Sequence, residues 1–315
     1  MKVVITSRSF GQISDAPNRI LDEAGIEAIH MGKDFDYAEF AKVIPEADAL
    51  IIGGHQFLPE DLRRCPKLRI ICKHGAGVDN IPLETAKEMG ITVTNAPAMN
   101  SEAVADFTFA HILNISRGVS IAAAGIRAGG YKAFTGRDVY GKTLGLIGFG
   151  AIGKAVTRRA LGFAMRVLVY DPYVSALARE WGAKVSLAAF DDLIALSDIV
   201  SIHAPLTEDT KNLFDKKTIS RMKKDAILVN AARGGIVNER DLYECVKGGH
   251  LFGAALDVTE DEPIRPDNPL LTLDNVVITP HMGMYSIEAM SAVSVVCAEN
   301  VARKLRGEEA LYVVS

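Results

Sequence analysis

Three loops of the chain carry side chains suited to proton transfer and to binding anions. Arg233 precedes two glycines, and its guanidinium has the planar fork that fits a carboxylate or a carbonyl oxygen. His281 follows Pro280, and imidazole is the side chain best suited to acid–base catalysis near pH 7. Residues 257–263 include four acids, one of which could hold an imidazole in one tautomer and keep it protonated.

Each of these residues also has a structural interpretation. Arg233 could form an ion pair, the acidic loop could be a solvated surface, and His281 could cap the helix that follows it. The catalytic interpretation requires that the three loops meet. Parallel strands would bring them together, because the carboxyl ends of such strands share one edge of the sheet.

A glycine-rich segment follows the apolar run 143–147 and has the pattern G-x-G-x-x-G over residues 148–153. Gly148 permits the tight turn, Gly150 lets a pyrophosphate approach the backbone, and Gly153 lets the helix lie close to the strand. The helix that opens with Ala151 and Ile152 offers unpaired N–H groups to the phosphates. The segment therefore predicts a dinucleotide site.

Asp171 ends the next apolar run, 167–170, about 20 residues beyond the middle glycine. An acid at this place is expected to accept hydrogen bonds from the adenosine ribose and to repel a 2′-phosphate, which favours NAD over NADP. The alternative is that Asp171 is a turn residue before Pro172.

The elements that must position these residues are short apolar runs alternating with helix-length amphipathic stretches. Such runs, separated by helices, predict parallel strands covered on both faces. The expected strands are 3–5, 49–52, 68–71, 91–93, 143–147, 167–170, 199–202, 226–229, 252–256 and 276–278.

The helical stretches divide the chain into two blocks. One helix is expected over 101–127, and another over 287–305 with one apolar stripe that packs back on the first block. We predict an α/β protein of two Rossmann/flavodoxin-like parallel-sheet domains with an interdomain cleft. The expected boundaries are 1–100 plus 285–315 for a substrate (catalytic) domain and 101–284 for an NAD-binding Rossmann domain.

The composition argues against several classes of protein. A formal net charge of −4 at pH 7 implies no basic face for nucleic acid or a membrane surface. The first residues predict a short strand and not a secretory signal, and no apolar run approaches the roughly 20 residues that cross a bilayer. The four cysteines show no metal-ligand spacing, so we expect reduced thiols, no metal and a cytoplasmic protein, with a disulfide as the alternative.

The motifs together resemble the D-isomer-specific 2-hydroxyacid dehydrogenase family, in its phosphoglycerate dehydrogenase-like branch. The resemblance covers nearly the whole chain in order. It rests on the segments 73–81, 95–97, 148–153, 203–206, 230–235, 257–263 and 280–281. The family's catalytic Arg, the Glu before a Pro and the His after a Pro correspond to Arg233, Glu262 and His281.

The resemblance implies further roles and a mechanism. A small 2-oxo acid would be reduced by NADH at C2, with His281 donating the proton, and the enzyme would be a homodimer through the NAD-binding domain. The backbone N–H groups of Gly75, Ala76 and Gly77 would bind the substrate carboxylate, and Lys73 and His74 are further expected substrate-binding residues. The expected cofactor residues beyond the glycine loop and Asp171 are Val78, Asp106, His203, Ala204, Pro205, Thr210, Ala231, Asp257 and Gly283.

Some positions depart from the family pattern. Residues 53–56 lack the Arg of phosphoglycerate-specific members, and Lys73 stands where an Arg is common. Because compact anions favour bidentate Arg, these departures argue against 3-phosphoglycerate as the substrate. Two other functions remain as alternatives. One is an NAD-sensing corepressor-like protein, and the other is a formate dehydrogenase, against which Glu262 argues because that enzyme places Gln beside its His.

Overall fold

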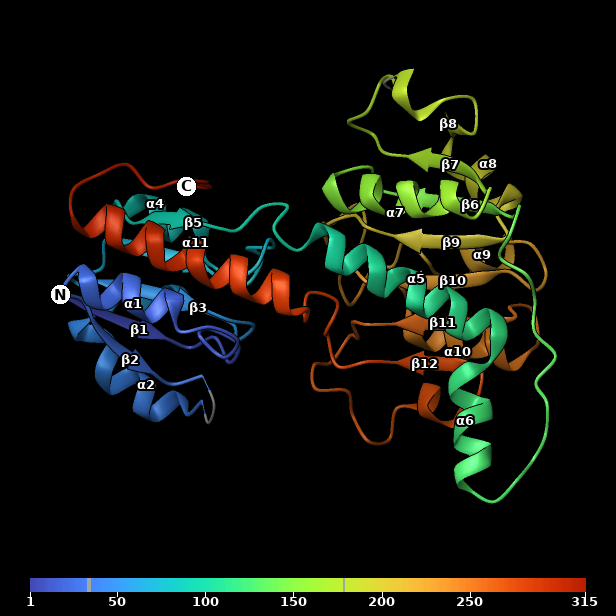
Figure 1. The fold of residues 1–315 in the computed structure, drawn as a ribbon, viewed down its shortest axis with the longest axis horizontal. Coiled ribbons are helices and arrows are strands. Elements are labelled where there is room, and N and C mark those ends of the chain that lie inside the picture. The colour runs from blue at the N-terminus through green and yellow to red at the C-terminus, as the bar shows by residue number, and fades with distance from the viewer. Residues whose placement is uncertain (33–34, 178) are drawn as a thin grey trace. The chain divides into compact units, whose positions relative to one another are not determined.

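The computed structural model describes residues 1–32, 35–177 and 179–315 (Figure 1). They form two compact units. Unit 1 comprises Met1–Ala103 and Met284–Ser315, and unit 2 comprises Val104–Gly283. Each unit contains one sheet in which every strand pair is parallel. The predicted α/β class with two parallel-sheet domains is therefore confirmed.

The sheet of unit 1 has the strand order β2-β1-β3-β4-β5. Its strands are β1 (Lys2–Ile5), β2 (Glu27–His30), β3 (Ala49–Ile52), β4 (Ile70–Lys73) and β5 (Thr92–Thr94). Successive side chains point to opposite faces of a strand, and in β1 both faces are buried. Val3 and Ile5 enter one apolar core, and Val4 enters the other. This double burial explains why the strand is apolar throughout.

Helices cover both faces of this sheet. They are α1 (Ala16–Glu23), α2 (Tyr37–Val43), η1 (Ile44–Glu46), α3 (Pro59–Arg63), α4 (Leu83–Glu88) and, from the chain's C-terminal part, α11 (Ile287–Leu305). Figure 1 shows α11 beside α1. Val293, Cys297 and Val301 of α11 belong to the same buried core as Val3. The final helix thus completes the first unit, as its apolar stripe predicts.

The sheet of unit 2 has the order β12-β11-β10-β9-β6-β7-β8. Its strands are β6 (Thr143–Ile147), β7 (Arg166–Tyr170), β8 (Val185–Leu187), β9 (Ile199–Ile202), β10 (Ile227–Asn230), β11 (Gly253–Leu256) and β12 (Val276–Ile278). The strand order reverses between β6 and β9, because the chain runs from β6 outward to β8 and then returns to β9. In open parallel sheets a ligand crevice lies at such a reversal, beyond the carboxyl ends of the strands.

The helical elements of unit 2 surround this sheet. They are α5 (Ser101–Arg117, which begins in unit 1), α6 (Val119–Arg127), α7 (Ala151–Gly162), η2 (Arg179–Trp181), α8 (Phe190–Leu196), α9 (Lys216–Ser220), α10 (Glu239–Lys247) and η3 (Pro269–Thr272). Two apolar cores result, and β6 contributes to both, through Leu144 and Leu146 on one side and Ile147 on the other.

The prediction of a single helix over 101–127 is wrong, because two helices, α5 and α6, cover this range. The chain bends by 65° between α5 and α6. Gly118 lies at the bend with φ +61°, a left-handed conformation that favours glycine. A β-carbon at Gly118 would lie 2.3 Å from the ring of Phe134, so the packing of the following loop also requires glycine. Across the described ranges, no single helix is long and apolar enough to span a membrane, although the bent pair would pass that test if joined.

Every strand predicted from an apolar run is present within two residues of its expected bounds, but β2 and β8 were missed. Both are edge strands, each paired with one neighbour only. Residues of β2 are partly or fully exposed, and only Val185 of β8 is buried. Neither segment therefore carries the apolar run on which the prediction depended. All four cysteines are free and buried, as expected for reduced thiols.

The close packing of α7 on β6 yields a stability prediction. A β-carbon at Gly153 would lie 2.3 Å from the carbonyl oxygen of Gly148, whereas one at Gly162 in the same helix would have no described residue within 4 Å. Gly153→Ala should lower the free energy of unfolding in urea by about 1–3 kcal/mol. Gly162→Ala should raise it by roughly 0.5–1 kcal/mol, because alanine loses less backbone entropy. Equal stability of the two variants would contradict this packing.

Candidate active site

The predicted chemistry-bearing loops of unit 2 do lie at one edge of its sheet. The glycine loop follows β6, Asp171 follows β7, and His203 follows β9. The Arg233 loop follows β10, Asp257 follows β11, and the loop of His281 follows β12. Since all these strands are parallel, the loops leave the sheet on the same side.

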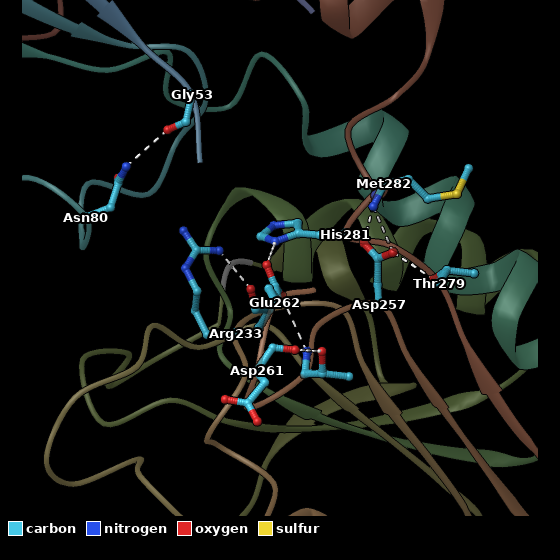
Figure 2. Close-up of polar contacts among 12 residues, drawn as sticks. Gly53, Asn80, Arg233, Asp257, Asp261, Glu262, Thr279, His281 and Met282 are labelled. Atoms are coloured by element: carbon cyan, nitrogen blue, oxygen red, sulfur yellow. Dashed lines mark hydrogen bonds and ion pairs between the residues drawn. The ribbon is translucent and has the colours of Figure 1, made fainter. Parts of the chain in front are cut away.

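His281 and Glu262 form a hydrogen-bonded pair (Figure 2). The His281 Nδ1 lies 2.8 Å from the Glu262 Oε2, and both side chains remain nearly half exposed, at 47% and 43%. A carboxylate can only accept a hydrogen bond, so Nδ1 carries the proton of this pair. The pairing leaves Nε2 as the ring nitrogen that can exchange a proton with a substrate.

The electrostatics of Glu262 favour its charged form. Burial raises the pKa of Glu262, but the hydrogen bond and charge of His281 oppose this effect, with help from the Thr259 N–H and the charge of Arg233. The sum places the pKa of Glu262 below its ordinary value. An ionised Glu262 can therefore stabilise a protonated His281.

Arg233 lies on a loop that Asn230 holds in place. The Asn230 Nδ2 donates to the Arg233 carbonyl oxygen at 2.9 Å, and its Oδ1 accepts the Ala232 N–H at 3.1 Å. The Arg233 Nη1 donates to the Ala232 carbonyl oxygen at 2.7 Å. Asn230 is buried at the end of β10, and no role was predicted for it from the sequence. Its only signal in the sequence is a polar residue that ends an apolar strand.

The buried Asp257 holds the loop of His281. Its carboxylate accepts hydrogen bonds from the Thr279 hydroxyl and from the backbone N–H groups of Met282 and Gly283 (Figure 2). The contact of this side chain with the cofactor stays a prediction. In the structure the side chain fixes the turn that carries His281, a function that was not predicted from the sequence.

The glycine loop fits a dinucleotide phosphate. Gly148 has φ +96°, and a β-carbon there would lie 2.6 Å from the His203 carbonyl oxygen. Among the described residues, no atom lies within 4 Å of a β-carbon built at Gly150, and no side chain caps the amino end of α7. This end of α7 is therefore an open set of backbone N–H groups backed by the helix dipole.

Two further residues near this loop suit a nucleotide. The Asp171 Oδ2 accepts the Phe149 N–H at 2.8 Å, so the acid that was expected to bind the ribose also fixes the glycine loop. The His203 ring donates to or accepts from the Ser201 hydroxyl through Nε2, and its buried Nδ1 has no partner among the described residues. Burial lowers the pKa of His203 to about 4, so the ring is neutral at pH 7.

The remaining residues expected to bind the cofactor are placed as follows. Asp106 on α5 is exposed and forms an ion pair with Arg159 of α7. The Thr210 hydroxyl donates to the Pro205 carbonyl oxygen at 2.7 Å and closes the loop after β9, which also carries Ala204. Ala231 follows β10, Gly283 is buried beside Asp257, and Val78 packs on a core of unit 1.

In unit 1, the loop after β4 carries the residues expected to bind the substrate carboxylate. Gly75 has φ +146°, and its N–H donates to the Lys73 carbonyl oxygen at 2.9 Å. Among the described residues, no group accepts the N–H of Ala76 or Gly77. The Lys73 ammonium donates to the Gly53 carbonyl oxygen and to the Asn80 side chain.

His74 directs its side chain into unit 1 rather than to the surface. It is 4% exposed, with Nε2 at 2.9 Å from the Ser294 hydroxyl and Nδ1 at 3.4 Å from the Ser9 hydroxyl. Burial, followed by the charge of Lys73, lowers the pKa of His74 to about 4. The neutral ring anchors the loop to α11.

Residues 109–283 match the family model described as the D-isomer specific 2-hydroxyacid dehydrogenase, NAD binding domain. The chain belongs to this family. Unit 2 is accordingly its NAD-binding domain, and the predictions of the family and of NAD as the cofactor are confirmed.

Relatives of known name agree with this membership. The chain is 40% identical over 303 residues to the D-3-phosphoglycerate dehydrogenase of Methanocaldococcus jannaschii, covering 94% of this chain and 57% of that protein. It is 38% identical over 289 residues to the hydroxypyruvate reductase of Thermotoga maritima, covering 90% and 92%. The solved structure of the TT0316 protein from Thermus thermophilus matches all of both chains with a TM-score of 0.92 at 38% identity. The chain spans only about half the length of the phosphoglycerate dehydrogenases.

The pair of Glu262 and His281 yields a pH prediction. A folded-state pKa below the ordinary glutamate value of about 4.3 gives stabilisation that is present above that value and is lost as the pH falls through the folded pKa. Glu262→Gln should therefore lower the free energy of unfolding at pH 6, by less than about 1 kcal/mol because the pair is partly exposed. The difference should vanish near pH 2.

Urea unfolding at both pH values measures this difference. The exposed Glu208 serves as the control, since Glu208→Gln removes a carboxylate without removing this pair. A destabilisation by Glu262→Gln that persists undiminished at pH 2 would show that the carboxylate does not act through its charge.

Proposed function

We propose that the protein is an NAD-dependent oxidoreductase that interconverts a small D-2-hydroxy acid and its 2-oxo acid. The observation that carries this proposal is the 2.8 Å bond between His281 and Glu262 on the same sheet edge as Arg233 and the glycine loop. This edge combines an acid–base group, a carboxylate that stabilises its protonated form, and a guanidinium. Membership of the family supports the same chemistry.

Arg233, His281 and Glu262 have different roles in the proposed reaction. The Arg233 guanidinium binds the carbonyl oxygen of the 2-oxo acid and stabilises the negative charge that develops on it. The His281 Nε2 donates a proton to that oxygen, and the Glu262 carboxylate stabilises the imidazolium through Nδ1. NADH, when bound at the glycine loop, would supply the hydride for C2. This hydride and the proton from His281 together account for the change of C=O to CH–OH. Oxidation of the hydroxy acid follows the same steps in reverse.

We propose that the loop of residues 75–77 binds the substrate carboxylate through the N–H groups of Ala76 and Gly77, since the Gly75 N–H already donates to Lys73. Asp171 is the proposed partner of the adenosine ribose, and its charge would oppose the 2′-phosphate of NADP. These assignments rest on the position of each residue within its own unit.

The substrate is proposed to lack a phosphate. His55 occupies the loop after β3, where a phosphate-binding enzyme would need a cation. Its ring stacks on Phe35 at a centroid distance of 4.5 Å, and its Nδ1 lies 3.1 Å from the Thr6 hydroxyl. Burial lowers the pKa of His55 to about 4, with a further contribution from Lys73, so this ring is uncharged at pH 7. Hydroxypyruvate and glyoxylate are therefore the first substrates to test.

Steady-state kinetics with NADH and a panel of 2-oxo acids tests the proposal. We expect turnover of hydroxypyruvate or glyoxylate to exceed that of phosphohydroxypyruvate. His281→Ala should lower kcat by about 10²- to 10⁴-fold, because a general acid is lost. Arg233→Ala should lower it by about 10²- to 10³-fold. NADH affinity, measured by fluorescence, should remain close to that of the wild type in both variants.

The control is Arg221→Ala, which removes an exposed arginine paired with Asp191. It should leave kcat unchanged. NADH binding without turnover of any acid in the panel would support an NAD-sensing binding protein instead. Near-normal kcat in His281→Ala would refute the proposed acid–base role.

We also propose a homodimer through unit 2. None of the residues of α6 is buried, although the helix is mostly apolar, and Val119 and Ile126 are 60% and 54% exposed. A second copy that covers this helix would remove these side chains from water.

Light scattering coupled to size-exclusion chromatography tests the dimer. Wild type should have twice the chain mass of 33.9 kDa, and Ile126→Asp should shift it toward the monomer. Leu196→Asp is the matched control, because Leu196 on α8 is also 54% exposed. A wild-type mass of 33.9 kDa, or equal dissociation by both substitutions, would contradict an interface at α6.

A further inference from the structure

The loop that presents His281 depends on one buried carboxylate. The Asp257 side chain is 2% exposed. Its Oδ1 accepts the Thr279 hydroxyl at 2.7 Å and the Met282 N–H at 2.9 Å, and its Oδ2 accepts the Gly283 N–H at 2.7 Å. The Asp257 carbonyl oxygen also accepts the His281 N–H at 2.8 Å. Three successive backbone N–H groups, those of residues 281–283, therefore donate to a single residue.

These bonds hold His281 in a conformation that it would not adopt readily by itself. His281 has φ +50°, in the left-handed region that is unfavourable for a residue with a β-carbon. The left-handed turn directs successive N–H groups inward, where a negative charge can bind them. The position of the imidazole thus depends on the orientation of the Asp257 carboxylate.

The two hydrogen bonds of the Thr279 hydroxyl have a defined direction. An ionised carboxylate has no proton to donate, so the single Thr279 proton must point to the Asp257 Oδ1. The Thr279 oxygen can then only accept from its second neighbour, the His111 Nε2, at 3.1 Å. His111 must therefore carry its proton on Nε2, which gives a chain from His111 through Thr279 to Asp257 (Figure 2 shows its last two members).

His111 is held firmly at the start of this chain. It lies on α5, is 4% exposed, and meets the Phe107 ring edge-on at a centroid distance of 4.5 Å. Burial lowers the pKa of His111, although the charge of Asp257 acts in the opposite direction. A neutral ring with its proton on Nε2 is the form that these surroundings favour.

We propose that His111 and Thr279 are positioning residues for His281, which act by orienting the Asp257 carboxylate that fixes the His281 turn. This inference rests on the proposed function, because it assigns His281 the proton transfer. Neither residue touches the reacting atoms. Each acts by fixing the direction of one hydrogen bond in a chain that ends at the backbone of His281.

Kinetics of paired variants test this role. Thr279→Val keeps the side-chain shape and removes the hydroxyl, and it should lower kcat by about 100-fold, the effect of a displacement near 1 Å in a catalytic group. Thr279→Ser keeps the hydroxyl and should retain most of the activity. In both, the KM for the 2-oxo acid should change little, since Arg233 and residues 75–77 remain.

A second pair tests the outer end of the chain. His111→Leu removes the donor and should lower kcat by about tenfold, as expected for one hydrogen bond. His111→Gln can place an amide N–H near the position of Nε2 and should restore most of the loss. Thermal unfolding of all four variants identifies any general loss of folding. Wild-type kcat in both Thr279→Val and His111→Leu would overturn the proposal.

A readout without turnover separates this proposal from the proposed function. Long-range ¹H–¹⁵N correlation spectra of the wild type at pH 7.5 report the tautomer of each histidine, and the signal absent from the His111→Gln spectrum identifies His111. The expected tautomer carries its proton on Nε2, and Thr279→Val should shift these ¹⁵N signals. A wild-type His111 protonated on Nδ1 would overturn the chain. Failure of the wild type to reduce any 2-oxo acid would instead refute the proposed function.

Discussion

The parallel direction of all seven strands in unit 2 is the constraint on which the candidate site depends. It places the ends of β6, β7, β9, β10, β11 and β12 on one side of the sheet. Residues separated by more than 100 positions in the sequence are thereby gathered at one edge. The strand order reverses between β6 and β9, at the centre of this edge. The glycine loop follows β6 and His203 follows β9, so both lie at this reversal.

Parallel strands bring loops together, but they do not fix side chains to within a fraction of an ångström. That precision comes from buried polar residues at the strand ends. Asn230 holds the Arg233 loop in place through two side-chain hydrogen bonds. The Asp257 carboxylate holds the His281 loop in place by accepting three. Burial makes these bonds effective, because an unpaired buried polar group is costly and so only the bonded arrangement is stable. Such residues fix the loops that carry the side chains of the candidate site.

Two histidines in unit 1 show that the charge of a side chain cannot be predicted from its residue type alone. His55 and His74 follow β3 and β4, at the sheet edge where a cation for an anionic substrate would be expected. Their surroundings lower the pKa of each to about 4, chiefly by burial. They are therefore neutral groups at pH 7. The proposal that the substrate lacks a phosphate is supported by this environment as well as by the missing arginine.

The sequence by itself determined the fold class, the family, every strand except β2 and β8, and the residue types at the strand ends. Apolar runs and glycine spacing are local patterns in the sequence. Burial of both faces of a sheet requires nearly every residue of a strand to be apolar, so these runs are easy to recognise. Features whose local sequence pattern is weak could be identified only from the tertiary structure. They are the edge strands β2 and β8, the bend at Gly118, and the bonds that join His111, Thr279 and Asp257 to the turn of His281. Those features depend on contacts between residues far apart in the chain, and such contacts leave no periodic signal in the sequence.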